Sequence, residues 1–142
     1  MSLEDLVEQR VAEAQYLTGD FPFTLTIVDG KLFPALRDYA FCHYDRHTNE
    51  ITIGVAPKFL RAHPTTQDAL LRHELGHAID FIIPPRTLNK YARSQGRVLS
   101  STPERRADDI AYLVWGDKIR YDHNLIQTLN TGIYPRPPEI GL

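Results

Sequence analysis

The chain has 142 residues, a formal net charge of −2 and 42% hydrophobic residues. This length and composition predict one soluble globular domain whose core needs neither a disulfide nor a structural metal. The near-neutral charge argues against a polyanion-binding protein as a class, and no stretch approaches the ~20 apolar residues of a membrane span. The N-terminal residues lack the pattern of a signal peptide, and Cys42 is the single cysteine, so we expect a cytoplasmic protein.

The first half of the chain predicts a helix followed by a small sheet. Apolar residues at helical spacing predict an amphipathic helix over residues 3–17, with Ser2 and Asp5 spaced as a capping box. Alternating apolar and polar residues then predict strands over residues 23–28, 40–44 and 50–55. The polar residues 45–49 have hairpin length, so we expect the last two strands to be adjacent and antiparallel.

The second half of the chain predicts two longer helices. Leucines, alanines and isoleucines at helical spacing predict a buried helix over residues 66–82, which ends before Pro84. Residues 84–102 show no strong periodicity, and such a long connection is either a functional loop or carries a short helix of its own. Pro103 opens another helix, which we expect to run to about Arg120.

The order of these elements predicts an α+β fold. We assign residues 1–120 to a single domain and residues 121–142 to a Pro-rich tail that packs on this domain or extends from it. Within the tail, residues 134–138 contain three prolines and predict an extended surface segment.

An HExxH motif lies inside the predicted buried helix. His73 and His77 are one helical turn apart, so both imidazoles can reach one metal ion. Glu74 is placed to hydrogen-bond a water molecule on that ion, which is the arrangement of zinc hydrolases. Gly76 costs helix stability in mid-helix, which indicates a close approach of another segment there. The motif therefore predicts a metal site rather than a chance pattern on a polar face.

Two histidines leave a catalytic zinc ion one protein ligand short, and three residues downstream are candidates. Asp80 lies too far along the helix from His73 and is better explained as the partner of an arginine. His123 stands in a polar segment, where a solvated surface histidine is the simpler interpretation.

Glu104 is the favoured third ligand. Asp108 follows at i+4, so both carboxylates project from one face of the helix that begins at Pro103. Asp108 can then accept a ring N–H from a ligand histidine and fix its orientation. The alternative is that residues 101–104 form a capping box, in which Glu104 would only cap the helix.

The two motifs together resemble a known family. HELGH at residues 73–77, followed by ERRADDIA at residues 104–111, resembles the gluzincin pattern and, within it, the small ImmA/IrrE-type intracellular peptidases. The resemblance implies a minimal zincin domain, with a small, mainly antiparallel sheet packed on the HExxH helix and its edge strand lining the cleft. Residues 113–116 depart from the segment that often follows the second motif in this family.

From these observations we expect a zinc metallopeptidase. One zinc ion per chain would be held by His73, His77 and Glu104, with Glu74 as general base and Asp108 orienting a ligand histidine. The substrate would be a protein or peptide bound along the edge strand. The competing hypothesis is a catalytically silent zinc-containing module that acts on a protein or nucleic-acid partner.

That competing hypothesis depends on a basic segment. Residues 86–106 contain six basic residues and one acidic residue. Tyr91, Arg93 and Arg97 within it could stabilise an oxyanion, grip an acidic substrate or contact phosphates, and a solvated loop is the simpler alternative. Few aromatic residues are interleaved there, so we expect no nucleic-acid partner.

Cys42 adjoins His43 in a predicted strand, where neighbours point to opposite faces, so we expect a buried structural thiol rather than a Cys–His pair.

Overall fold

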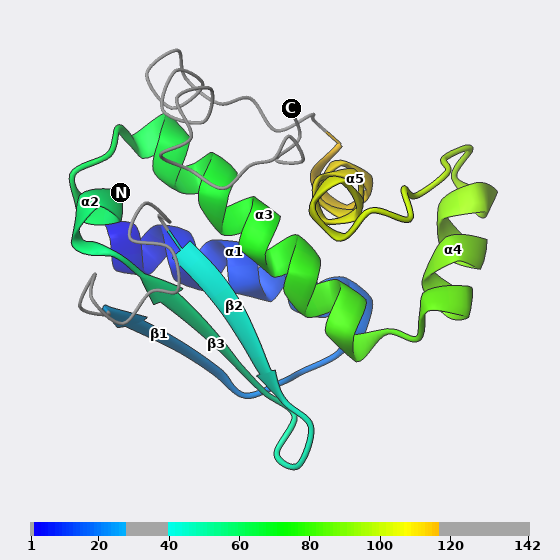
Figure 1. Cartoon of the computed structure of the whole chain (residues 1–142), viewed down its shortest axis with the longest axis horizontal. Helices are drawn as coiled ribbons and strands as arrows, with labels where there is room; N and C mark the ends of the chain where they lie inside the picture. Colours follow the sequence, from blue (N-terminus) through cyan, green and yellow to red (C-terminus); the bar gives the residue numbers. More distant parts are fainter. Residues whose placement is uncertain (1, 28–39, 117–142) are drawn as a thin grey trace.

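The structure, a computed structural model, describes residues 2–27 and 40–116 (Figure 1). The helices in this part of the chain are α1 Leu3–Thr18, α2 Pro57–Leu60, α3 Pro64–Ile82, α4 Pro85–Ser94 and α5 Pro103–Trp115. The strands are β1 Phe23–Ile27, β2 Ala40–Asp45 and β3 Glu50–Val55. The predicted α+β class is confirmed. No helix among the described residues has both the length and the apolar character that a membrane span requires.

The three strands form one mixed sheet in the order β1–β3–β2. The hairpin is as predicted, because β2 pairs antiparallel with β3 across the turn that contains Asn49. The expectation of a mainly antiparallel sheet is wrong, because β1 pairs parallel with β3. The central strand β3 supplies Ile51, Ile53 and Val55, which are 0–1% exposed, to the core. These side chains belong to the middle strand of the sheet, which pairs with a neighbour along each edge.

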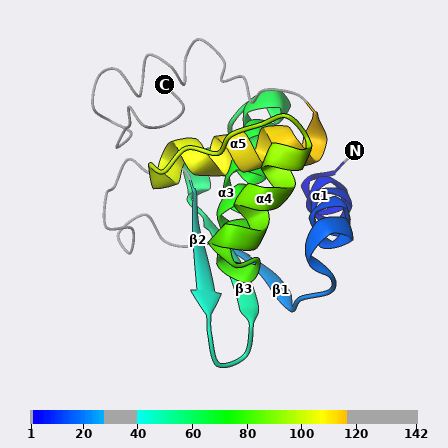
Figure 2. The ribbon, with the colours of Figure 1, turned by 90° about the vertical axis from the view of Figure 1, so that its right-hand side faces the viewer.

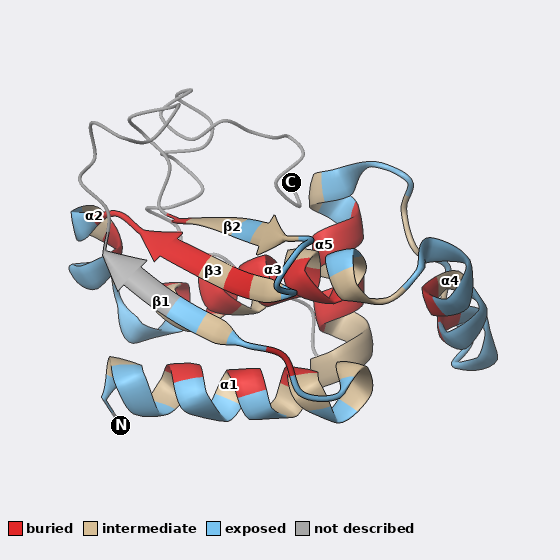
Figure 3. Ribbon diagram, turned by 90° about the horizontal axis from the view of Figure 1, so that it is seen from below, coloured by how far each residue is buried: buried red, intermediate tan, exposed pale blue. Residues whose placement is uncertain are grey.

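Helix α3 is the centre of the molecule and packs against β2, α1 and α5. The buried residues lie mainly on β3 and on the facing sides of α1, α3 and α5 (Figure 3). Helix α1 begins as predicted, with Ser2 Oγ accepting a hydrogen bond from the backbone N–H of Asp5. The Arg10 guanidinium then pairs with the Asp68 carboxylate at 2.8 Å and ties α1 to α3.

Several element boundaries differ from the prediction. Helix α3 begins earlier, at Pro64, because the ring of His63 accepts a hydrogen bond from the N–H of Thr65 and caps the first turn. Helix α5 ends at Trp115 rather than near Arg120, because Gly116 adopts a left-handed conformation with φ 78°. The non-periodic segment carries a short helix, α4, and the single-turn helix α2 was not predicted.

Some of the structural predictions concern residues outside the described part of the chain. These are the C-terminal tail over residues 121–142, its segment 134–138, His123, and the last residue predicted for the first strand.

Candidate metal centre

Helices α3 and α5 contact each other backbone to backbone at Gly76. A Cβ atom at this position would collide with the carbonyl oxygen of Ala107 and would lie 3.0 Å from its carbonyl carbon. The glycine in mid-helix is therefore explained by this close approach. Helix α5 crosses α3 with its first turn on the side of β2 (Figure 2). The close approach of the two helices brings His73 and His77 on α3 next to two carboxylates on α5, those of Glu104 and Asp108.

Three potential ligand atoms converge. The Nε2 atoms of His73 and His77 lie 2.9 and 3.3 Å from the same oxygen, Glu104 Oε1. All three atoms lie within 4.8 Å of one another, so the group could hold a metal ion. Ligand atoms about 2.0–2.1 Å from a tetrahedral zinc ion are about 3.3–3.4 Å apart, so small side-chain adjustments suffice for zinc. The donor set of two imidazoles and one carboxylate also fits zinc.

Asp108 lies where the sequence predicts a partner for a ligand histidine. Nδ1 of His73 is 2.6 Å from Asp108 Oδ1, and the His73 side chain is only 1% exposed. When Nδ1–H donates to Asp108, Nε2 of the same ring is the atom directed at Glu104. A buried ring held in this way has one orientation, in which Nε2 is directed at Glu104 and is available to a metal ion.

The charges of the site interact strongly. Burial alone would lower the pKa of His73, but the hydrogen bonds to Asp108 and Glu104, with the charge of Glu74, raise it to about 10. Burial would raise the pKa of Glu104, but hydrogen bonds and charge interactions with both histidines hold it well below its usual range. Without a metal, a proton on His73 thus neutralises part of the carboxylate charge that a cation would otherwise neutralise.

Glu74 lies on α3 near β2. Its side chain is 4% exposed, and its charge contributes to the raised pKa of His73. Burial and, after it, the charge of Glu74 also raise the pKa of Cys42 on β2. Helix α3, which carries Glu74, packs against β2, which carries Cys42. Cys42 itself is half-buried, while His43 is exposed, as expected for neighbours on opposite faces of a strand.

Asp80 pairs with an arginine, as the sequence indicates, and is not part of the metal-binding group. Its Oδ1 accepts a hydrogen bond of 2.9 Å from Nε of Arg106, which is 8% exposed. The same guanidinium donates to Asn89 on α4, so Arg106 joins α3, α4 and α5.

Glu104 does not act as a helix cap. The N-cap of α5 is Thr102, without a side-chain cap hydrogen bond, so Glu104 is the second helical residue rather than the third. Its carboxylate contacts the histidines instead. This geometry agrees with the ligand interpretation and not with a purely capping role.

An aromatic row, which we did not predict, extends from the metal-binding group to β2. It consists of His77, Phe81 and Tyr44. The ring of Phe81 lies 6.4 Å from the ring of His77 and 5.7 Å from that of Tyr44, with interplanar angles of 21° and 15°. The i+4 spacing of His77 and Phe81 was the available signal. The position of Tyr44 required knowledge of how the sheet packs on α3.

The basic segment forms two different structures. Arg86, Lys90 and Arg93 are exposed at i, i+4 and i+7 along α4 and form a basic stripe. The Arg97 guanidinium instead lies 3.7 Å above the ring of Tyr112 on α5. Arg97 therefore fastens the α4–α5 connection to the fold.

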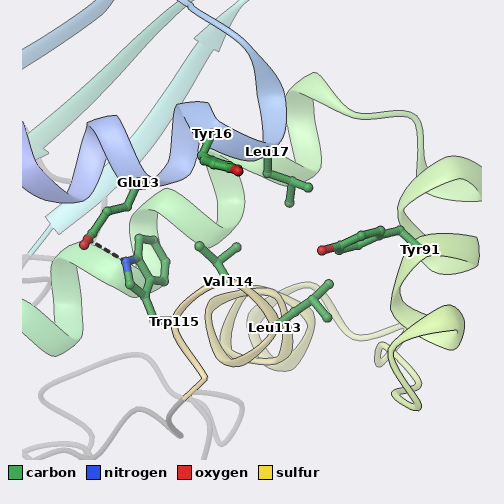
Figure 4. Close-up of a pocket in the computed structure, with 7 residues that line it drawn as sticks. All are labelled: Glu13, Tyr16, Leu17, Tyr91, Leu113, Val114 and Trp115. Atoms are coloured by element: carbon green, nitrogen blue, oxygen red, sulfur yellow. Dashed lines mark hydrogen bonds between the residues drawn. The ribbon is translucent and has the colours of Figure 1, made fainter.

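A hollow of about 510 Å³ lies between α1, α4 and α5 (Figure 4). Tyr91 is one of its lining residues, with Tyr16, Trp115 and the Glu13 side chain. None of the predicted metal ligands lines it, so this hollow is separate from the metal-binding group.

The chain was compared with protein-family models, with curated proteins and with solved structures, and none of these comparisons found a match.

Proposed function

We propose that the protein is a zinc-dependent metallopeptidase of the gluzincin type, acting on a protein or peptide substrate in the cytoplasm. One observation carries the proposal. Two helix histidines and Glu104 converge on one point, while Asp108 holds the other nitrogen of His73. Structural zinc sites are usually closed by four protein ligands, whereas three leave a position open for chemistry.

The residues have complementary tasks in this reaction. A zinc ion bound by His73, His77 and Glu104 would lower the pKa of a water molecule that it coordinates. Glu74 takes the proton of the attacking water on its carboxylate and passes it to the leaving amine. Asp108 accepts the Nδ1–H of His73 and keeps that ring in its binding orientation.

The sheet offers a place for an extended substrate. Among the described strands, β2 pairs only with β3 and so has one open edge. Helix α3, which carries Glu74, packs against β2. A peptide that pairs with the open edge of β2 would therefore pass close to the helix that carries the general base. Main-chain pairing of this kind gives affinity with little dependence on sequence.

The first test measures zinc content and peptidase activity together. Wild type, Glu104→Ala and Glu74→Gln are compared, with Glu8→Gln, an exposed carboxylate on α1, as the matched control. We expect about one zinc per chain in wild type, Glu74→Gln and Glu8→Gln, and loss of most zinc in Glu104→Ala. Glu74→Gln should lower the rate of peptide hydrolysis by about 10²–10⁴-fold without loss of zinc.

Two results would contradict the proposal. Full zinc retention by Glu104→Ala would remove Glu104 from the ligand set. A wild-type protein that binds no zinc after reconstitution would exclude the peptidase mechanism altogether.

A second candidate function is a zinc-containing binding module that recognises an acidic partner, a protein or a nucleic acid, through the basic stripe on α4. The stripe supports it, because Arg86, Lys90 and Arg93 are exposed on one helix face. This candidate predicts that the protein binds its acidic partner in a salt-dependent way and that changing all three residues to Gln abolishes this binding. The Glu74→Gln variant should bind the partner with the same affinity as wild type.

A further inference from the structure

The aromatic row of His77, Phe81 and Tyr44 contains a large apolar side chain that the core does not use. Phe81 is 46% exposed and lies outside the hydrophobic core cluster. In the same part of α3, Ala78 and Ile79 are fully buried and provide the core contacts. The exposed ring of Phe81 is thus not explained by the packing of the domain.

Phe81 lies directly beside the metal-binding group, on the same helix as its two histidines. Phe81 follows His77 by one helical turn, and the planes of the two rings are nearly parallel, with their centroids 6.4 Å apart. His77 is also the ligand that approaches Glu104 Oε1 at 3.3 Å. An apolar surface therefore begins directly beside the place where the reaction would occur.

The other end of the row is held by the β2–β3 hairpin. The hydroxyl of Tyr44 donates a hydrogen bond of 2.6 Å to Asn49 Oδ1 in the turn, and its ring stacks on Phe81. Tyr44 lies on β2, the strand whose open edge we propose for substrate pairing. The aromatic surface is thus anchored at both ends and needs no rearrangement to receive a ligand.

We propose that the exposed part of Phe81, together with Tyr44 on which it stacks, is a specificity subsite for an apolar and above all aromatic side chain of the substrate, next to the bond that is cleaved. This inference rests on the proposed peptidase function for the identity of the substrate. A peptide along β2 presents alternate side chains to the same face, so one of them meets Phe81. Aromatic side chains gain most there, because offset or edge-to-face ring contacts add to the burial of apolar area.

The first experiment measures cleavage preference with the full-length, zinc-loaded protein. Matched peptides that carry Phe or Gly beside the scissile bond are compared by kcat/KM. Wild type should prefer Phe by about 10–100-fold, and Phe81→Ala should bring this ratio close to one. Tyr16→Ala is the control, because Tyr16 is also an exposed aromatic residue, 89% exposed on α1. It should keep the wild-type ratio.

Phe81→Leu separates a loss of the subsite from damage to the fold. This change keeps an apolar side chain and removes the ring, so the preference should shift from aromatic to aliphatic residues. The zinc content of both Phe81 variants should equal that of wild type, since Phe81 is not one of the candidate ligands. A Phe/Gly ratio that stays unchanged in both variants would overturn the inference.

A binding measurement tests the subsite without catalysis. Phenylalanine hydroxamate and glycine hydroxamate, which chelate zinc, are titrated into the zinc-loaded protein by calorimetry. If wild type binds the phenylalanine compound more tightly and Phe81→Ala loses this preference, the result supports the subsite. This holds even if wild type cleaves no peptide, because a lack of cleavage would refute only the peptidase function. Equal affinity of the two compounds for wild type would refute the subsite, whatever the peptidase activity.

Discussion

Replacing Gly76 by alanine tests the contact on which the candidate metal centre depends. A methyl group at this position would collide with the carbonyl oxygen of Ala107 and lie 3.0 Å from its carbonyl carbon. Carbon atoms in favourable contact are about 3.5–4.0 Å apart, so α3 and α5 must separate by roughly 0.5–1 Å. Because both partners are backbone, no side-chain rotation can relieve the collision.

The expected magnitude follows from two opposing effects. Alanine is better than glycine in a helix interior by about 1 kcal/mol. Overpacking of a rigid contact costs up to about 3 kcal/mol. The metal-free Gly76→Ala protein should therefore lose about 2 kcal/mol of unfolding free energy. The separation also moves Glu104 away from the histidines, so zinc affinity should fall by about 10–100-fold, as for other changes that misplace ligands.

Denaturant unfolding in the presence of a chelator measures the first quantity, and competition with a chromophoric chelator measures the second. Thr87→Ala on α4 replaces an exposed helical residue by one of higher helix propensity, and it controls for the helix effect. A Gly76→Ala protein that is more stable than wild type and binds zinc equally well would refute the reasoning, because helix propensity would then outweigh the contact.

Two further predictions concern the charges around the site. The pKa of His73 is raised to about 10, so the ring is protonated near pH 7.5 without metal and must lose a proton from Nε2 to bind zinc. Calorimetric zinc titrations in buffers of different ionisation enthalpy should therefore show release of about one proton from His73 per zinc ion bound. The release should be smaller in Asp108→Asn, because His73 there loses a partner that raises its pKa. An equal proton release in both proteins would contradict this. Separately, Asp80→Ala should destabilise the protein by about 3 kcal/mol, since Arg106 is left buried without its charge partner. Denaturant unfolding checks it against Asp20→Ala, an exposed carboxylate expected to change stability by less than about 0.5 kcal/mol.

The part of the fold with local signals could be predicted from the sequence. Helices α1 and α3 and the hairpin follow from periodicity, a cap and a turn that lie within each segment. The parallel pairing of β1 with β3 could not be predicted, because these strands are not consecutive in the chain and no local turn sets their relative direction. Helix α2 has a single buried residue, Phe59, and no side-chain cap, so its four residues carry no sequence pattern that distinguishes a helix from a loop.

The candidate site divides in the same way. His73 and His77 share one helix, and their convergence is a property of helical geometry alone. The proximity of Glu104 depends on the crossing of α3 and α5, for which the sequence offered only indirect signs: a glycine in mid-helix and a pair of carboxylates at i, i+4. The pairing of Asp80 with an arginine was predicted, but the identity of that arginine required the fold. The roles of these residues in metal binding and catalysis stay predictions.

The junction of α1 with the end of α5 provides an optical probe for all of these experiments. The chain contains one tryptophan, Trp115, whose indole N–H donates a hydrogen bond of 2.9 Å to Glu13 on α1 beside the hollow (Figure 4). Its fluorescence therefore comes from a single place, and that place is where the last turn of α5 meets the N-terminal helix. Variants that shift α5 as a rigid body should change the emission, whereas variants that only remove a metal ligand should leave it unaltered. Intrinsic fluorescence can thus separate displacement of the helix from loss of the ion without any added label.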